Sequence, residues 1–211
     1  MKRVINLDNW NRKEHFKFFS ALDDPFWGIT MTVDFTSIYQ QSKNMEVSFF
    51  LYSVYFLLKC INATTAFKLR IENGEVVEYD KINISPTIGR EGGTFGFGFF
   101  EYDTDLSLFI ENAEKEIHRV KNSTGLSFSK DTARADVIRY SALPWFAFSE
   151  MKHAGSIQTG DSIPKISIGK LIQEKKKLLL PISISVHHGL VDGRNVAEFI
   201  QNVKDGQNNT L

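Results

Sequence analysis

The stretch from Leu178 to Gly193 reads Leu-Leu-Leu-Pro-Ile-Ser-Ile-Ser-Val-His-His-Gly-Leu-Val-Asp-Gly, and it decides the fold. From Ile182 onward apolar residues alternate with serine, which is the period-two pattern of a strand with one buried face. Beyond the Asp-Gly pair, apolar residues recur at helical spacing, so Asp192 stands where a helix N-cap belongs. We therefore expect a buried strand that leads directly into an amphipathic helix.

The two adjacent histidines fall on opposite faces of this predicted strand. His188 shares a face with Ile184 and Val186, whereas His187 shares the serine face. Burial disfavours the charged form of an imidazole, and a neutral imidazole can accept a proton, as a general base must. The pattern thus makes His188 a candidate base. The structural alternatives are a hydrogen-bonded core histidine and, for Asp192, simple helix capping.

Length and composition indicate an ordinary globular protein. The chain has 211 residues, of which 42% are hydrophobic and 24% are charged. Lys plus Arg and Asp plus Glu each number 25, so the formal net charge is zero. This balance gives no electrostatic reason to expect nucleic acid or an anionic membrane as partner. We expect residues 1–211 to form one domain with a single core.

Cysteine usage and hydropathy narrow the class further. Cys60 is the only cysteine, so an internal disulfide and a cysteine-based metal cluster are both excluded. Its apolar neighbours are typical of an inert buried thiol. The longest apolar run, near residues 49–58, is too short to span a bilayer, and no apolar segment follows the charged start of the chain. The expectation is a soluble cytoplasmic protein.

The rest of the chain alternates between helical and extended patterns. Helices are predicted at residues 11–22, 36–43, 47–62 and 106–120, the first with a capping box formed by Asn11 and Glu14. Strands are predicted at residues 27–35, 67–72, 75–79, 84–88, 94–102, 136–143, 146–150, 165–171 and 177–188. Asn73-Gly74 signals a type I′ hairpin turn. Because no strict βαβ rhythm is present, we expect an α/β two-layer sandwich with a mixed, mostly antiparallel sheet packed by helices.

Five segments, in order along the chain, resemble chloramphenicol acetyltransferase, a family of coenzyme A-dependent acyltransferases with an HxxxDG motif. The matching segments are Trp10–Phe16, Phe67–Arg70 with the Asn73–Glu75 turn, Ser141–Trp145, Pro164–Lys170 and His187–Gly193. They are spread over nearly the whole chain and follow the family's order. The resemblance therefore implies the chloramphenicol acetyltransferase-like fold for the entire sequence.

The resemblance also implies a role for each matching polar residue. His188 corresponds to the general base that removes the proton from the acceptor hydroxyl. Ser141 corresponds to the serine that donates a hydrogen bond to the tetrahedral oxyanion. Asp192 and Arg12 correspond to a buried ion pair that shapes the site. Ser167 stands where the family usually has a threonine that holds an ordered water.

The acceptor pocket is where this sequence departs from the antibiotic-inactivating members. The resemblance assigns substrate contacts to Phe19, Trp27, Phe95, Phe128 and Ser167. Phe19, however, stands where those members commonly have tyrosine, and the segment 23–27 replaces a mainly apolar stretch with one that begins at Asp23. An acidic residue in an apolar pocket costs several kcal/mol unless it is paired or turned to solvent. Lys170 is assigned to the coenzyme A phosphates.

The resemblance implies acetyl-CoA as co-substrate, no metal or prosthetic group, a small hydroxyl acceptor, and a homotrimer with active sites at subunit interfaces. Two alternatives stay open. One is an acyltransferase of the same fold with a different acceptor, the fold type shared by dihydrolipoamide acyltransferases. The other is a non-catalytic relative that binds a hydrophobic ligand, which the altered segment 23–27 permits.

Overall fold

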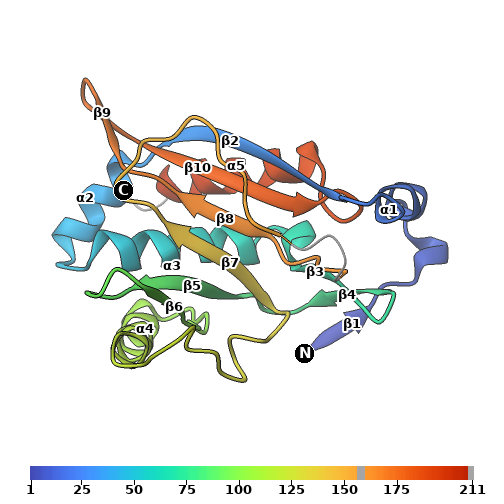
Figure 1. The fold of residues 1–211 in the computed structure, drawn as a ribbon. Helices are drawn as coiled ribbons and strands as arrows, with labels where there is room; N and C mark the ends of the chain where they lie inside the picture. The colour runs from blue at the N-terminus through green and yellow to red at the C-terminus, as the bar shows by residue number, and fades with distance from the viewer. Residues whose placement is uncertain (156–159, 209–211) are drawn as a thin grey trace.

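The computed structural model describes residues 1–155 and 160–208 and shows β-sheets packed by helices (Figure 1). Within these ranges the larger sheet has seven strands in the spatial order β2-β10-β8-β7-β5-β6, with β9 paired to β10. These strands are β2 (Phe26–Asp34), β5 (Asn83–Gly89), β6 (Phe95–Phe97), β7 (Val137–Ala142), β8 (Lys165–Ile168), β9 (Ile172–Glu174) and β10 (Lys177–His187). β7 runs parallel to β5 and β8, and the other pairs are antiparallel. The predicted mixed, mostly antiparallel sheet is confirmed.

A smaller antiparallel sheet lies beside the larger one. It has the order β1-β4-β3 and contains β1 (Lys2–Val4), β3 (Leu69–Glu72) and β4 (Glu75–Tyr79). Asn73 and Gly74 join β3 to β4 with φ angles of 52° and 81°, as a type I′ turn requires. The guanidinium of Arg70, which is fully buried, donates to the carbonyls of Ala135 (2.8 Å) and Val137 (2.6 Å). Arg70 therefore ties the small sheet to β7.

The helices leave one face of the larger sheet free. They are α1 (Lys13–Ser20), α2 (Thr36–Asn44), α3 (Phe49–Asn62), α4 (Leu106–Lys121) and α5 (Gly193–Asn208), with 3-10 turns η1 (Leu7–Asn9) and η2 (Thr65–Lys68). α3 and α5 lie behind the sheet in Figure 1, where α3 buries Val54 and Leu58 completely. The opposite face, called here the open face, is crossed by the chain that leaves β7 at Leu143 and returns to β8 (Figure 1). The core thus sits between the sheet and α3 and α5.

Three element predictions were wrong in detail. The capping box of Asn11 and Glu14 is absent, because a turn closed by the Lys13 amide and the Trp10 carbonyl (3.0 Å) places Asn11 ahead of α1. The strand predicted at 146–150 is irregular, since a turn between Leu143 and Phe146 diverts the chain. The strand predicted at 94–102 is limited to β6 and one isolated bridge at Phe100.

Candidate active site

His188 lies one residue beyond β10, beside the start of β2. Its backbone amide donates to the carbonyl of Pro25 at 2.8 Å. The Phe19 ring stacks on the imidazole with a centroid separation of 3.7 Å and an interplanar angle of 3°, and the Trp27 ring lies 5.5 Å away. Nδ1 is buried and has no hydrogen-bond partner among the described residues. Nε2 is therefore the ring nitrogen that stays available for a hydrogen bond.

The strand predicted to run through His188 ends at His187. The amides of Leu190 and Val191 both donate to the His187 carbonyl at 3.0 Å, and this turn carries the chain off the sheet. His188 is consequently half-buried on a loop between β10 and α5 rather than within a strand. Its aromatic neighbours still give it the apolar surroundings that the sequence predicts.

His187 is the more deeply buried histidine, with 3% of its surface exposed. It belongs to the open face, where its Nδ1 accepts a hydrogen bond from the Gly189 amide at 3.2 Å. Burial, with a smaller contribution from His188, lowers the pKa of His187 to about 4. His187 is therefore neutral near neutral pH and braces the turn that presents His188.

Arg12 and Asp192 form the ion pair that fixes this turn. The Arg12 guanidinium donates to the Asp192 carboxylate and to the His188 carbonyl, the latter at 3.3 Å. The other carboxylate oxygen accepts from the amides of Arg194 (2.9 Å) and Asn195 (3.1 Å), so Asp192 also caps α5. Burial alone raises the pKa of Asp192, but Arg12 and these amides hold it below its usual value. Ion pairing and capping are thus both roles of this aspartate.

Trp27 contributes to the same arrangement from β2. Its indole N–H donates to the Val191 carbonyl at 2.9 Å, so the polar edge of the ring is already used within the chain. The ring itself faces His188. The geometry makes Trp27 a support for the histidine loop. Trp27 also lines the cleft on the open face, and its substrate contact stays a prediction.

A row of hydroxyl groups crosses the open face at the level of Ser141. Ser141 on β7 is in register with Ser167 on β8, which is in register with Ser183 on β10. The Thr87 hydroxyl donates to the Ser141 hydroxyl at 3.1 Å. His153, which the sequence gave no signal to single out, places Nε2 at 3.0 Å from the Ser167 hydroxyl. Ser167 and Ser183 are almost fully buried against the crossing chain, whereas Ser141 is half-buried.

One chain does not bring His188 and Ser141 together. Ser183 lies in the Ser141 row, two strands away from β7, and His188 follows five residues later, one residue past the end of β10. At about 3.3 Å per residue and about 4.8 Å between strands, the two side chains lie on the order of 15–20 Å apart. Within one chain the two side chains are therefore too far apart to act on the same acetyl group.

Two of the predicted acceptor contacts, Phe95 and Phe128, lie at the surface. Phe95 is 48% exposed and Phe128 is 70% exposed, and both contact Phe97, at centroid separations of 5.8 and 5.5 Å. Asp23 is exposed, so its carboxylate avoids the cost of burial. Lys170 is also exposed, two residues after the end of β8.

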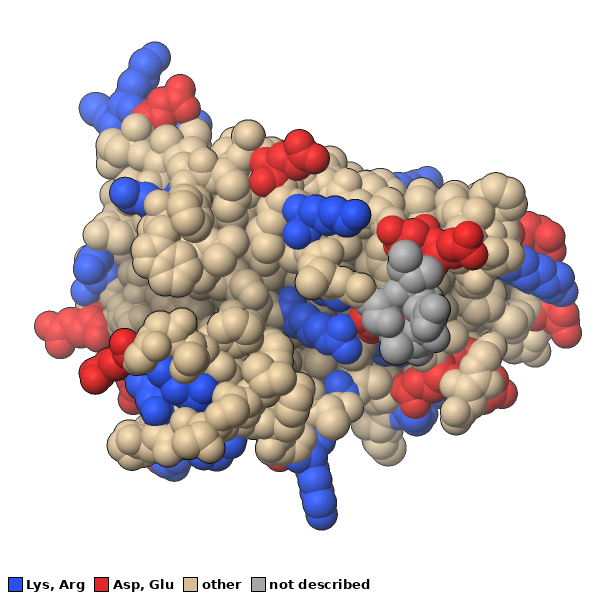
Figure 2. All heavy atoms as spheres, in the orientation of Figure 1, with Lys and Arg blue, Asp and Glu red and all other residues tan. Residues whose placement is uncertain are grey.

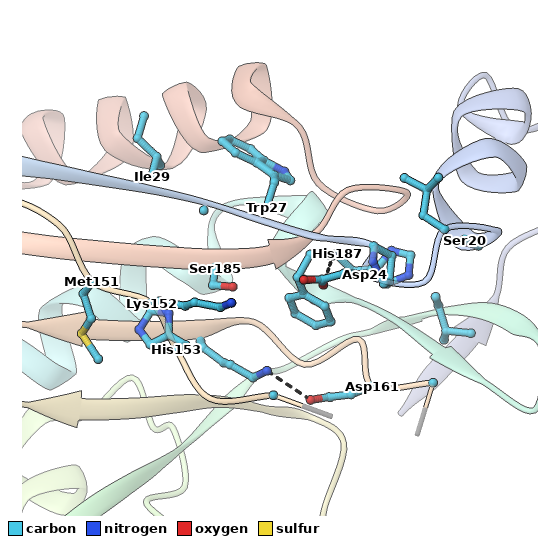
Figure 3. Close-up of a pocket in the computed structure, with 18 of the residues that line it drawn as sticks. Ser20, Asp24, Trp27, Ile29, Met151, Lys152, His153, Asp161, Ser185 and His187 are labelled. Carbon is cyan, nitrogen blue, oxygen red and sulfur yellow. Dashed lines mark hydrogen bonds and ion pairs between the residues drawn. The ribbon is translucent and has the colours of Figure 1, made fainter. Parts of the chain in front are cut away.

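A cleft of about 920 Å³ opens on the same face, next to the histidine loop (Figure 3). Its polar lining includes Asp24, His153, Asp161, Lys165 and His187. The Lys165 ammonium lies 3.5 Å from the Asp161 carboxylate. Acidic and basic side chains are interspersed on this face of the molecule (Figure 2).

No helix in residues 1–155 and 160–208 is both long and apolar enough to pass through a bilayer. In the same ranges, no three His, Cys, Asp or Glu side chains are grouped so that they would ligate a metal ion.

The two-layer fold, with a histidine loop that opens a helix at Asp-Gly, is that of an acyltransferase. The chain belongs to the chloramphenicol acetyltransferase family, whose model matches residues 2–204. It is 28% identical over 208 residues to chloramphenicol acetyltransferase 3 of Escherichia coli, covering 98% of this chain and 97% of that one. The Clostridioides difficile chloramphenicol acetyltransferase is 27% identical over 205 residues, covering 95% and 93%.

Solved structures agree with this assignment. A chloramphenicol acetyltransferase superimposes with a TM-score of 0.90 at 30% identity, covering 98% of this chain and 100% of that one. A probable dihydrolipoamide acetyltransferase from Listeria monocytogenes gives a TM-score of 0.68 at 13% identity, covering 98% and 94%. The second likeness is one of fold alone.

Proposed function

We propose that this protein is an acetyl-CoA-dependent O-acetyltransferase in which His188 acts as general base in a ternary complex. The observation that carries the proposal is the set of contacts that hold His188 and its loop in place. The imidazole is stacked on Phe19, its Nδ1 is buried, and its loop is tied to α1 through Arg12. A base held in this way presents one nitrogen in one direction, which is the preorganisation that general-base catalysis needs.

The proposed reaction is a direct transfer of the acetyl group. Nε2 of His188 takes the proton of the acceptor hydroxyl as its oxygen attacks the thioester carbonyl of acetyl-CoA. The Ser141 hydroxyl donates to the oxyanion that forms, which stabilises the transition state. The carbon–sulfur bond then breaks, and the coenzyme A sulfur leaves with the proton returned by His188. Lys170 is proposed to contact the coenzyme A phosphates.

The separation of His188 from Ser141 within one chain supports a shared site. We place His188 of one subunit opposite Ser141 of its neighbour, in a homotrimer, because a ring of identical head-to-tail contacts repeats this pairing in every subunit. The exposed Phe95 and Phe128 would then line the neighbour's half of the pocket. The same proposal takes residues 1–211 as one acyltransferase domain that works in the cytoplasm.

The acceptor is proposed to be more polar or more cationic than chloramphenicol. Phe19 supplies no hydroxyl, and its ring is fully engaged with His188. Asp24 lines the cleft beside the histidine loop, and Asp23 is exposed next to it. Carboxylates at the mouth attract a positively charged substrate. Chloramphenicol should therefore be a poor acceptor.

The test is a screen of hydroxyl compounds for thiol release from acetyl-CoA, with chloramphenicol measured in parallel. We expect turnover on a polar or aminated acceptor, normal saturation by acetyl-CoA and a high KM for chloramphenicol. Phe19→Tyr restores a hydroxyl and should improve chloramphenicol use by about tenfold at most, the value of one neutral hydrogen bond. Coenzyme A binding without turnover on any compound would favour the non-catalytic relative. Efficient chloramphenicol turnover with high-level resistance would refute the acceptor proposal.

A further inference from the structure

His153 is a buried polar side chain for which the proposed reaction has no use so far. It lies on the chain that crosses the open face, at the wall of the cleft (Figure 3). Its Nε2 is 3.0 Å from the Ser167 hydroxyl, and its Nδ1 is buried without a hydrogen-bond partner in the described residues. Burial, and then the charge of Lys165, lower the pKa of His153, so its ring is neutral.

A neutral imidazole carries one ring hydrogen, on either Nδ1 or Nε2. With the hydrogen on Nε2, the ring donates to the Ser167 oxygen at 3.0 Å, and the serine's own hydrogen points elsewhere. With the hydrogen on Nδ1, the serine would instead donate to Nε2 and its hydrogen would be used there.

We propose that His153 is a positioning residue that, by donating to Ser167, directs the Ser167 hydroxyl hydrogen into the acetyl-transfer site beside Ser141. Thr87 has the same relation to Ser141, since its hydroxyl donates to the Ser141 oxygen at 3.1 Å. Each of the two serines thus receives one donor from the protein and keeps its own hydrogen for the oxyanion or for a water bound to it. This inference rests on the proposed function.

The neighbours of His153 leave this contact undisturbed. The Lys165 ammonium is directed to the Asp161 carboxylate at 3.5 Å and lies over the Phe26 ring, 4.5 Å from its centroid. The Ser183 hydroxyl donates to the Met151 carbonyl at 3.4 Å. Neither group supplies Ser167 with a donor, so the role falls to Nε2 of His153.

Three substitutions of His153 distinguish the contribution of Nε2 from that of Nδ1. The amide nitrogen of glutamine reaches the position of Nε2, whereas that of asparagine reaches only the position of Nδ1, and leucine has no donor. His153→Leu and His153→Asn should each lower kcat about tenfold, the value of one neutral hydrogen bond. His153→Gln should restore most of this loss, and KM for both substrates should stay nearly constant. His118→Gln, at an exposed position on α4, is the matched control.

A double-mutant cycle with Ser167→Ala separates positioning from packing. Once the serine hydroxyl is gone, His153→Leu should lower kcat no further. A full additional loss in that background, a wild-type kcat in His153→Leu, or equal losses in the Gln and Leu variants would overturn the proposal. The cycle starts from the wild-type enzyme. Loss of its turnover in the His188→Ala variant shows that the measured activity comes from the proposed site. An inactive wild type refutes the proposed function and this inference with it, whereas an active wild type with unaffected His153 variants refutes this inference alone.

Discussion

The histidine loop and the hydroxyl row are held by different kinds of contact. The loop is fixed within one chain, by the stacking of Phe19 on His188 and by the ion pair of Arg12 with Asp192. The hydroxyl row lies on a sheet face that no helix of the described residues covers, and the aromatic side chains Phe128 and Trp145 are 70% and 71% exposed.

In the proposed mechanism the base is therefore held in place within each chain, whereas a neighbouring chain completes the acceptor side. The exposed aromatics require burial, and a second copy of the chain supplies it in the proposed trimer.

The largest effect is expected from His188→Ala. Removing the base should lower kcat about a hundredfold to ten-thousandfold, while acetyl-CoA binding and folding change little because the side chain is half-buried on a loop. The control is His187→Asn, which keeps an acceptor for the Gly189 amide and should retain most of the activity. Equal losses from the two variants in steady-state kinetics would contradict the assignment of the base.

The ion pair is expected to matter next. Asp192→Asn keeps a good N-cap for α5 but removes the charge that pairs with Arg12. Because both side chains are partly exposed, with 31% and 17% of their surface accessible, we expect a loss of about 1–3 kcal/mol of unfolding free energy. The loop should loosen as well, lowering kcat about tenfold or more.

Asp8→Asn is the matched control for this ion pair, because Asp8 pairs with Lys13 on the exposed side of α1. It should leave the melting temperature and kcat unchanged. If Asp192→Asn behaves like Asp8→Asn in denaturant titrations, the ion pair is a surface contact and does not shape the site.

The smallest effect concerns pH and His187. Burial lowers its folded pKa to about 4, below the value of about 6.5 in the unfolded chain. The unfolded chain therefore binds more protons between these values, so the stability contributed above pH 6.5 is lost as the pH falls toward 4. His187→Asn should flatten this part of the stability profile measured by denaturant melts. An identical slope in wild type and variant would contradict the buried neutral state.

The sequence predicted the fold wherever short-range patterns decide it. The alternation from Ile182 to His187 and the Asn73-Gly74 turn carry local signals, and both β10 and the hairpin are present. The end of β10 depends on the turn at Gly189, so the strand was predicted one residue too long. Residues 146–150 look extended, but contacts distant in sequence determine their path.

The site was predictable only in part. Arg12 and Asp192 could be predicted because each lies in a short sequence motif. The ion pair between them is present in the structure. No local sequence pattern marks His153, because its proposed role depends on its contact with Ser167 on β8. The support role of Trp27 was also hidden, because the Val191 carbonyl that it binds is 164 positions away in the chain. Such pairings arise from the topology rather than from sequence spacing.

The most direct test of the shared site is complementation between two inactive variants. His188→Ala and Ser141→Ala chains, each inactive alone, are mixed and reassembled in equal amounts, then assayed for acetyl transfer. Random mixing should pair an intact His188 with an intact Ser141 at about a quarter of the interfaces, so about a quarter of wild-type activity should return. Mixtures that stay as inactive as the separate variants, although sizing shows that mixed oligomers have formed, would contradict a site built from two chains.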